Sequence, residues 1–182
     1  MVTLFILILL AIAFYSGARR GLTLQLVYTV GYFISYLAAK HYYKDLAPKL
    51  ELYIPYPSVT ENSQLVFFTK EMGLELDQAY YAAIAFLLIL FFGWILTRFV
   101  GIFAHSLTYL PILRQFDWIA GGLLSVVLMY VGIFLVLTLL TLLPVDFIQN
   151  LFKDSGVARG IVENTPIFSN QIQNLWVNNI LK

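Results

Sequence analysis

The sequence contains no cysteine and few charged residues, and each shortage excludes a class of protein. Without cysteine there is no disulfide, no thiolate nucleophile and no cysteine-ligated metal site. Only 12% of the residues are charged, against about 25% in an ordinary soluble domain, whereas 60% are hydrophobic. The net charge of +1 provides no basic excess for binding nucleic acid. A polar surface cannot be built from this composition, so lipid is the expected solvent for much of the chain.

The sequence also lacks the common motifs of catalysis and of nucleotide binding. It has no phosphate-binding loop, no zinc-protease motif and no serine-hydrolase motif. The two histidines, His41 and His105, lie far apart in the sequence and are expected at the membrane interface rather than around a metal. We therefore expect no enzyme activity, no cofactor, and no catalytic, cofactor-binding or metal site.

The sequence instead contains long uncharged stretches. A membrane-spanning helix needs about 20 predominantly apolar residues, and lipid requires every backbone polar group to be paired within the protein. The fold predicted is an all-α membrane protein with four transmembrane helices in two hairpins, followed by an amphipathic C-terminal helix. The four predicted spans are residues 2–18, 21–39, 78–97 and 118–145.

These spans predict two domains. Residues 1–145 form a four-helix transmembrane domain with an extracytoplasmic loop at residues 40–77, and residues 146–182 form an extracytoplasmic tail. In the tail, Thr165-Pro166 is expected to start a helix, with Thr165 as the N-cap. This helix is expected on the outer leaflet or against the bundle, because one face of it is apolar and carries Phe168, Ile172, Leu175 and Trp176.

The distribution of lysine and arginine predicts the orientation. Arg19 and Arg20 lie between the first two spans, Arg98 and Arg114 lie between the last two, and the loop at 40–77 has more acidic than basic residues. Because basic links stay in the cytoplasm, both termini are expected to be extracytoplasmic. The arginines follow the first apolar run rather than precede it, which favours a retained span over a cleaved signal peptide.

Residues 99–113 stay apolar beyond the third predicted span but contain His105 and Pro111. This segment either extends the third helix or lies flat at the membrane interface. The sequence leaves both interpretations open.

Residues 21–33 align with residues 122–134 at a constant offset, with matches at Gly, Leu, Val, Gly and Phe. One interpretation is that the two hairpins form a parallel internal repeat, related by an axis along the membrane normal. The other is a coincidence between two apolar helices.

Two pairs of glycines stand near the ends of predicted spans. Gly17 and Gly21 form either a turn where the chain reverses, which we favour, or a G-x-x-x-G helix contact. Gly121 and Gly122 occupy the corresponding place in the second half. Directly before the fourth span, Asp117 is expected to cap that helix, and the alternative is a pairing with Arg114 or Arg20.

Three motifs, in order along the chain, carry a resemblance to a known family. They are FYSGARRGL at 14–22, LPILRQFDWIAGGL at 110–123, and DSGV at 154–157 followed by TPIF at 165–168. In this order and spacing the chain resembles the bacterial colicin V production protein (CvpA) family over nearly its whole length.

The resemblance implies a four-span protein of the bacterial inner membrane, linked to the production of a secreted toxin. It brings no established catalytic residue or transport substrate. Some members fuse a similar membrane domain to an extracytoplasmic serine protease, and the resemblance here does not include that part. The structural or assembly candidates, most of which match signature positions of the family, are Gly17, Arg20, Gly21, Asp117, Gly121 and Gly122.

Two functions are consistent with these observations. The first is a non-enzymatic membrane component that supports toxin production, secretion or envelope homeostasis. Its partners would be the lipid bilayer and either further copies of itself, as a homo-oligomer, or other membrane proteins, and not nucleic acid. The second is a small oligomeric channel or transporter. No predicted span has an ionisable residue near its middle, which favours the first function, because such residues mark ion and proton paths.

Overall fold

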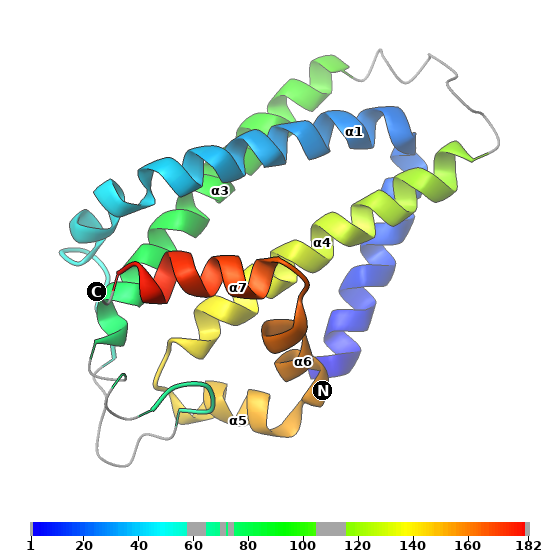
Figure 1. The fold of residues 1–182 in the computed structure, drawn as a ribbon. Coiled ribbons are helices and arrows are strands. Elements are labelled where there is room, and N and C mark those ends of the chain that lie inside the picture. The colour runs from blue at the N-terminus through cyan, green and yellow to red at the C-terminus, as the bar shows by residue number, and fades with distance from the viewer. Residues whose placement is uncertain (1, 58–64, 70–71, 73–74, 105–115, 181–182) are drawn as a thin grey trace. The chain divides into compact units, whose positions relative to one another are not determined.

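The computed structural model describes residues 2–57, 65–69, 72, 75–104 and 116–180, and it contains helices and no strands within these ranges (Figure 1). Three helices are long and apolar enough to cross a membrane: α1 (Val2–Leu50), α3 (Leu76–Ala104) and α4 (Asp117–Thr141). The chain is therefore an all-α protein with three long apolar helices.

Three shorter helices follow α4. They are α5 (Asp146–Asp154), α6 (Gly156–Asn164) and α7 (Phe168–Gln173), and α7 continues directly into a π-helical turn, η2 (Asn174–Asn178). Ser155 separates the first two of these helices and caps the second, because its hydroxyl accepts the backbone N–H of Ala158 at 3.2 Å.

The chain divides into two compact units, which are described separately below. Apart from the first two residues, unit 1 comprises residues 3–38 and 89–133, and unit 2 comprises residues 39–88 and 134–182. Unit 1 thus contains most of α1, the second half of α3 and most of α4. Unit 2 contains the remaining parts of these helices and all of α5, α6 and α7.

A break at Gly21 shapes α1. The two predicted spans at 2–18 and 21–39 correspond to two helical segments of α1, which meet at a kink at Gly21, with φ 77° and ψ 168°. A positive φ of this kind strains every residue that has a Cβ, which explains glycine here. The first segment continues through Arg19 and Arg20, beyond the predicted span end at 18. The helix also continues to Leu50, beyond the predicted span end at 39. Charges mark where a helix leaves lipid, but they do not end the helix.

The fourth predicted span at 118–145 is too long at its end. The helix α4 ends at Thr141, and the backbone tightens there, since the N–H of Leu142 donates to Leu139 O at 3.1 Å. Pro144 explains this end, because proline lacks an N–H and disfavours the helical conformation in the residue before it.

The helix α3 begins at Leu76 and continues to Ala104, so it includes the first part of the 99–113 segment. Its continuation past the predicted end at 97 favours the extended third helix for residues 99–104. Residues 105–115, with His105, Pro111 and Arg114, lie outside the described residues.

The predicted start of the C-terminal helix at Thr165 is wrong. Thr165 instead caps the end of α6, and its hydroxyl donates to Ile161 O. The next helix begins at Phe168 after Ile167, which has a positive φ of 68°. On its inner face Ile172 and Trp176 are fully buried, and the π-helical turn brings Val177 to the same side.

Candidate functional site

The crossing of α1 and α4 in unit 1 is built on glycine. A Cβ added to Gly121 would lie 2.7 Å from the carbonyl carbon of Gly21 and 2.9 Å from the carbonyl oxygen of Gly17. A Cβ added to Gly17 would collide with the side chain of Ser125. In lipid the hydrophobic effect does not favour one helix partner over another, so close approach through small residues supplies the packing energy. Gly17 therefore belongs to a helix contact and not to a turn.

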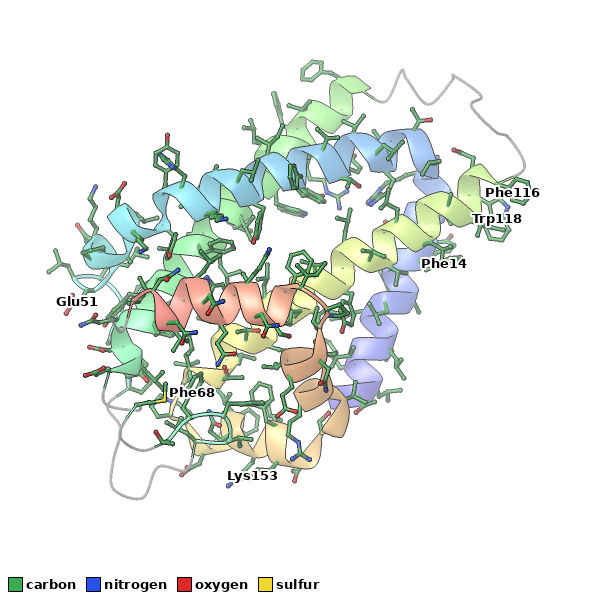
Figure 2. All side chains as sticks on the ribbon, viewed as in Figure 1. Phe14, Glu51, Phe68, Phe116, Trp118 and Lys153 are labelled. Carbon is green, nitrogen blue, oxygen red and sulfur yellow. The ribbon has the colours of Figure 1, made fainter. Side chains whose placement is uncertain are left out.

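Aromatic rings flank this crossing. Gly122 makes room for Phe14, whose ring atom Cε2 would lie 2.7 Å from a Cβ at Gly122. The Phe14 ring also meets Trp118 edge to face, with centroids 6.5 Å apart, near the start of α4 (Figure 2). Phe14 therefore fills the space that the glycine leaves between the two helices.

Asp117 connects α4 to the break in α1. Its Oδ1 accepts the backbone N–H of Leu22 at 2.9 Å, and its Oδ2 occupies the place where a Cβ of Gly21 would be. The break at Gly21 makes Leu22 the start of a new helical segment, so the carboxylate caps that segment and complements its positive end. Asp117 is also the first residue of α4, but its hydrogen bond is to the other helix. Among the described residues it forms no ion pair with Arg20, and the alternative partner Arg114 is not described.

A second crossing in unit 1 joins α1 to α3, and the pattern of contacts shows that the helices are antiparallel. A Cβ at Gly31 would collide with Thr97, and a Cβ at Gly93 would collide with Ser35. The hydroxyls of Ser35 and Thr97 donate at 2.7 Å to carbonyls of their own helices, Gly31 O and Gly93 O. The hydrogen-bond donors of these buried hydroxyls are therefore satisfied within their own helices, so they need no partner from the lipid or from another helix.

Sequence analysis missed this second crossing. Its signal was present in α3, where Gly93, Thr97 and Gly101 recur every four residues, as in the small-residue motifs of membrane helices. Gly101 faces Tyr28, whose ring would collide with a Cβ at that position.

A cluster of arginines and aromatic rings lies beside this crossing. The guanidinium carbon of Arg98 is 4.7 Å from the ring centroid of Tyr28 and 5.5 Å from that of Trp94. The guanidinium carbon of Arg20 is 5.5 Å from the same Tyr28 ring. Tyr32 stacks on Tyr28 at a centroid distance of 6.3 Å. Arg20, a candidate from the sequence, thus joins a cluster whose other members sequence analysis did not select.

Unit 2 is held by aromatic packing. Tyr43, Phe86 and Trp176 form a buried aromatic cluster of edge-to-face contacts, with centroid distances of 6.1 Å and 5.6 Å between successive rings. The Tyr43 hydroxyl also donates to Leu175 O at 2.9 Å. This aromatic cluster connects the end of α1, the first half of α3 and the C-terminal helix in one core.

Gln149 is a buried polar connection in unit 2. It is 1% exposed, and its Nε2 donates to Leu143 O at 2.8 Å, beyond the end of α4. Its Oε1 accepts the N–H of Val66 at 3.0 Å. One amide therefore satisfies backbone groups from two distant segments, and nothing in its local sequence predicts this.

Tyr56 connects the segment after α1 to the end of α4. Its hydroxyl donates to Leu142 O at 2.8 Å. Burial raises the pKa of Tyr56 to about 12, and Asp77 contributes in the same direction. The phenol therefore stays protonated, and able to donate, far above neutral pH.

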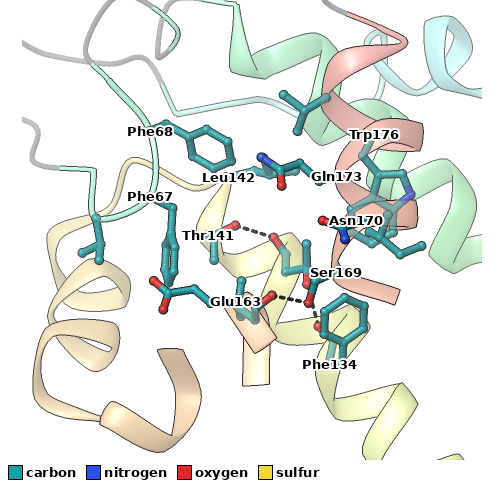
Figure 3. A pocket seen from close by; sticks show the side chains of 15 residues that line it. Phe67, Phe68, Phe134, Thr141, Leu142, Glu163, Ser169, Asn170, Gln173 and Trp176 are labelled. Atoms are coloured by element: carbon teal, nitrogen blue, oxygen red, sulfur yellow. Dashed lines mark hydrogen bonds between the residues drawn. The ribbon is translucent and has the colours of Figure 1, made fainter. Parts of the chain in front are cut away.

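Unit 2 also has a cavity of about 370 Å³ (Figure 3). Phe67, Phe68 and Phe134 provide aromatic walls, while Asn170 and Gln173 provide amides from α7. Among the described residues that line the cavity, Glu163 is the one carboxylate. Within the described part of the chain, no cluster of three His, Asp or Glu residues could hold a metal ion.

Comparison with known proteins agrees with the fold. The model of the family described as "Colicin V production protein" matches residues 2–166. The chain is 33% identical over 177 residues to the "Uncharacterized transmembrane protein YshB" of Bacillus subtilis (strain 168), a match that covers 97% of each chain. No solved structure matches the chain. The protein is therefore a multi-pass membrane protein that belongs to the colicin V production protein (CvpA) family.

Proposed function

We propose that this protein is a non-enzymatic component of the bacterial cytoplasmic membrane that supports toxin production, secretion or envelope homeostasis by binding other membrane proteins or further copies of itself. The observation that carries the proposal is the contrast between two faces of α3. At Gly93 and Gly101 one face of α3 packs closely on side chains of α1. The other face carries Phe92, Phe99 and Phe103, which are 66%, 57% and 71% exposed. Aromatic rings are enriched at the centres of protein interfaces, so this face suits a protein partner as well as lipid.

The proposal includes four crossings, with α1 reversing at Gly21 and with both termini extracytoplasmic. The antiparallel contacts support it: the first part of α1 packs on α4, and its second part packs on α3. A parallel repeat exchanges the first span with the third and the second with the fourth. Under this exchange the contact between the first and fourth spans becomes the contact between the third and second spans. Both contacts are present, as a parallel repeat requires.

Photo-crosslinking in native membranes tests the proposed function. A photoreactive phenylalanine replaces Phe99 in a tagged, full-length chain, and the matched control replaces Phe86 in the same helix, which is fully buried. We expect a reproducible protein adduct from position 99 and none from position 86, with the partner identified by mass spectrometry. Adducts to lipid alone at position 99, and to no protein at other exposed positions of this face, would contradict the proposal.

The alternative function is a small oligomeric channel or transporter, and Gln25 favours it. This residue is 2% exposed within the apolar part of α1, and its Oε1 is buried without a hydrogen-bond partner among the residues that the structure describes. A buried acceptor without a donor lowers the stability of the fold. Such an acceptor can receive a hydrogen bond from water or from a polar solute that crosses the membrane beside it. Flux through liposomes containing only the purified protein, abolished by Gln25→Leu and retained in Thr29→Val, would establish this function instead.

A further inference from the structure

The charges of unit 1 are almost all of one sign. Its sequence contains four arginines, no lysine and a single acidic residue, Asp117. That carboxylate is occupied by the N–H of Leu22. The other nine acidic residues of the chain all belong to unit 2. Positive charge in unit 1 therefore has little negative charge of its own to balance it.

Arg20 and Arg98 bring two of these positive charges close together. Both guanidinium groups lie against the ring of Tyr28, at 5.5 Å and 4.7 Å, so two like charges share one aromatic platform. Within the described part of the chain, neither forms an ion pair with a carboxylate, and the Nε of Arg98 is buried without a hydrogen-bond partner. The stretch 105–115, which lies outside the described residues, contains no Asp or Glu in its sequence and can supply no carboxylate either.

Two adjacent cations in a partly apolar setting repel each other, and aromatic faces compensate only part of the cost of desolvation. A bound anion would remove the repulsion and satisfy the remaining N–H donors. Guanidinium groups match the oxygens of phosphate in paired hydrogen bonds. Arg20 and Arg98 both adjoin long apolar stretches, so they lie at the depth where the phosphates of lipid headgroups are found.

We propose that Arg20 and Arg98, held on the face of Tyr28, bind a phosphate group at the membrane interface, with the headgroup of an anionic phospholipid as its source. The guanidinium carbon of Arg98 also lies 5.5 Å from the ring centroid of Trp94, so a second aromatic ring holds this side chain. The site is formed by α1 and α3 together, so an occupied site also bridges these two helices.

The test uses the full-length protein in detergent, with thermal unfolding followed as phosphatidylglycerol, phosphatidylcholine or inorganic phosphate is added. Arg20→Gln and Arg98→Gln remove one donor group each. Arg19→Gln is the matched control, because Arg19 is the adjacent arginine, is exposed, and lies over the separate ring of Tyr15. Arg98→Lys keeps the charge and removes the planar fork.

We expect phosphatidylglycerol, and not phosphatidylcholine, to raise the unfolding midpoint of the wild type and of Arg19→Gln. The apparent affinity should fall about tenfold or more in Arg20→Gln and Arg98→Gln, and less in Arg98→Lys. Retained stabilisation in both glutamine variants, or an equal loss in Arg19→Gln, would overturn the proposal. Equal protection by inorganic phosphate without lipid would support the phosphate site and overturn its lipid source.

If the glutamine variants fail to fold, a second measurement on the wild-type protein alone tests the proposal. Native mass spectrometry of the wild type should show a bound phosphatidylglycerol that survives when phosphatidylcholine is in excess. A wild type that carries both lipids in proportion to their supply would overturn the proposal without any variant.

Discussion

The two units of this protein are packed by different means. In unit 1, helices meet where a glycine removes the side chain, as at Gly121 against Gly17 and Gly21. In unit 2, large rings fill the interior, as in the buried aromatic cluster of Tyr43, Phe86 and Trp176. The sequence of unit 1 contains four arginines and no lysine, whereas unit 2 contains all the lysines.

The difference is the one expected if lipid surrounds the helices of unit 1 and water surrounds the short helices of unit 2. Between helices surrounded by lipid there is no hydrophobic gain, so association depends on close backbone approach and on a few hydrogen bonds. The short helices of unit 2 have outer faces that are mostly polar, apart from Phe147 and Val157, and a buried apolar side. This is the pattern of packing driven by water. Unit 1 should therefore be sensitive to added volume, and unit 2 to lost volume.

The largest effect is expected from lost volume in unit 2. Trp176→Ala removes a fully buried ring and should lower the free energy of unfolding by about 3–5 kcal/mol. Phe147→Ala, at a ring that is 72% exposed in the same unit, should change it by less than about 0.5 kcal/mol. Denaturation in mixed micelles measures both, and similar losses in the two variants would contradict an aromatic core.

Added volume in unit 1 should give the next largest effect. Gly121→Ala places a methyl group against the backbone of α1, which cannot move aside as a side chain can, and should destabilise the fold by about 1–3 kcal/mol.

The control for this variant is Gly132→Ala in the same helix, where a Cβ would meet nothing within 4 Å. It should be neutral or stabilising by up to about 1 kcal/mol, because alanine favours helix over glycine. Equal effects at the two glycines would show that the helix crossing is absent.

A smaller effect is expected at the hydrogen bond between Asp117 and Leu22. Asp117→Ala removes the cap from the helical segment after Gly21 and should lower stability by about 1–2 kcal/mol. Asp117→Asn keeps an oxygen acceptor and should lose less than half of that. An asparagine variant as unstable as the alanine variant would indicate that the charge, and not the cap, is what matters.

The smallest effect at neutral pH is expected at Tyr56. Tyr56→Phe removes one hydrogen bond to Leu142 O and should lower stability by about 0.5–1 kcal/mol. The pKa of Tyr56 is about 12 in the folded protein and about 10 in an unfolded chain. Its contribution is therefore complete below pH 10 and is lost as the pH rises through 12. The difference between wild type and Tyr56→Phe should shrink over that range, and a constant difference would contradict the assignment.

The sequence predicted the apolar helices and their approximate positions because long gaps between charges directly reflect the thickness of the bilayer. It also selected Gly17, Gly121 and Asp117, which the structure brings together at one crossing. It did not predict that Asp117 would bond to Leu22, because a partner 95 residues away has no local signal.

Other misses have different physical reasons. The end of α4 was readable from Pro144, but the count of apolar residues outweighed it. The start of the C-terminal helix depends on the positive φ of Ile167, which is unusual for a branched side chain and follows from tertiary packing rather than from local preference. The cluster of Arg20 and Arg98 combines residues from two helices, so neither residue alone indicated it.

The central claim of the proposed function is that the link at Arg19 and Arg20 lies in the cytoplasm and that α1 crosses the bilayer twice, reversing at Gly21. The natural absence of cysteine allows a direct measurement with single cysteines and a membrane-impermeant maleimide in intact cells. Arg19→Cys should react only after the membrane is opened, whereas Lys49→Cys should react in intact cells. Labelling of Arg19→Cys in intact cells, or no labelling of it in opened membranes, would contradict the claim.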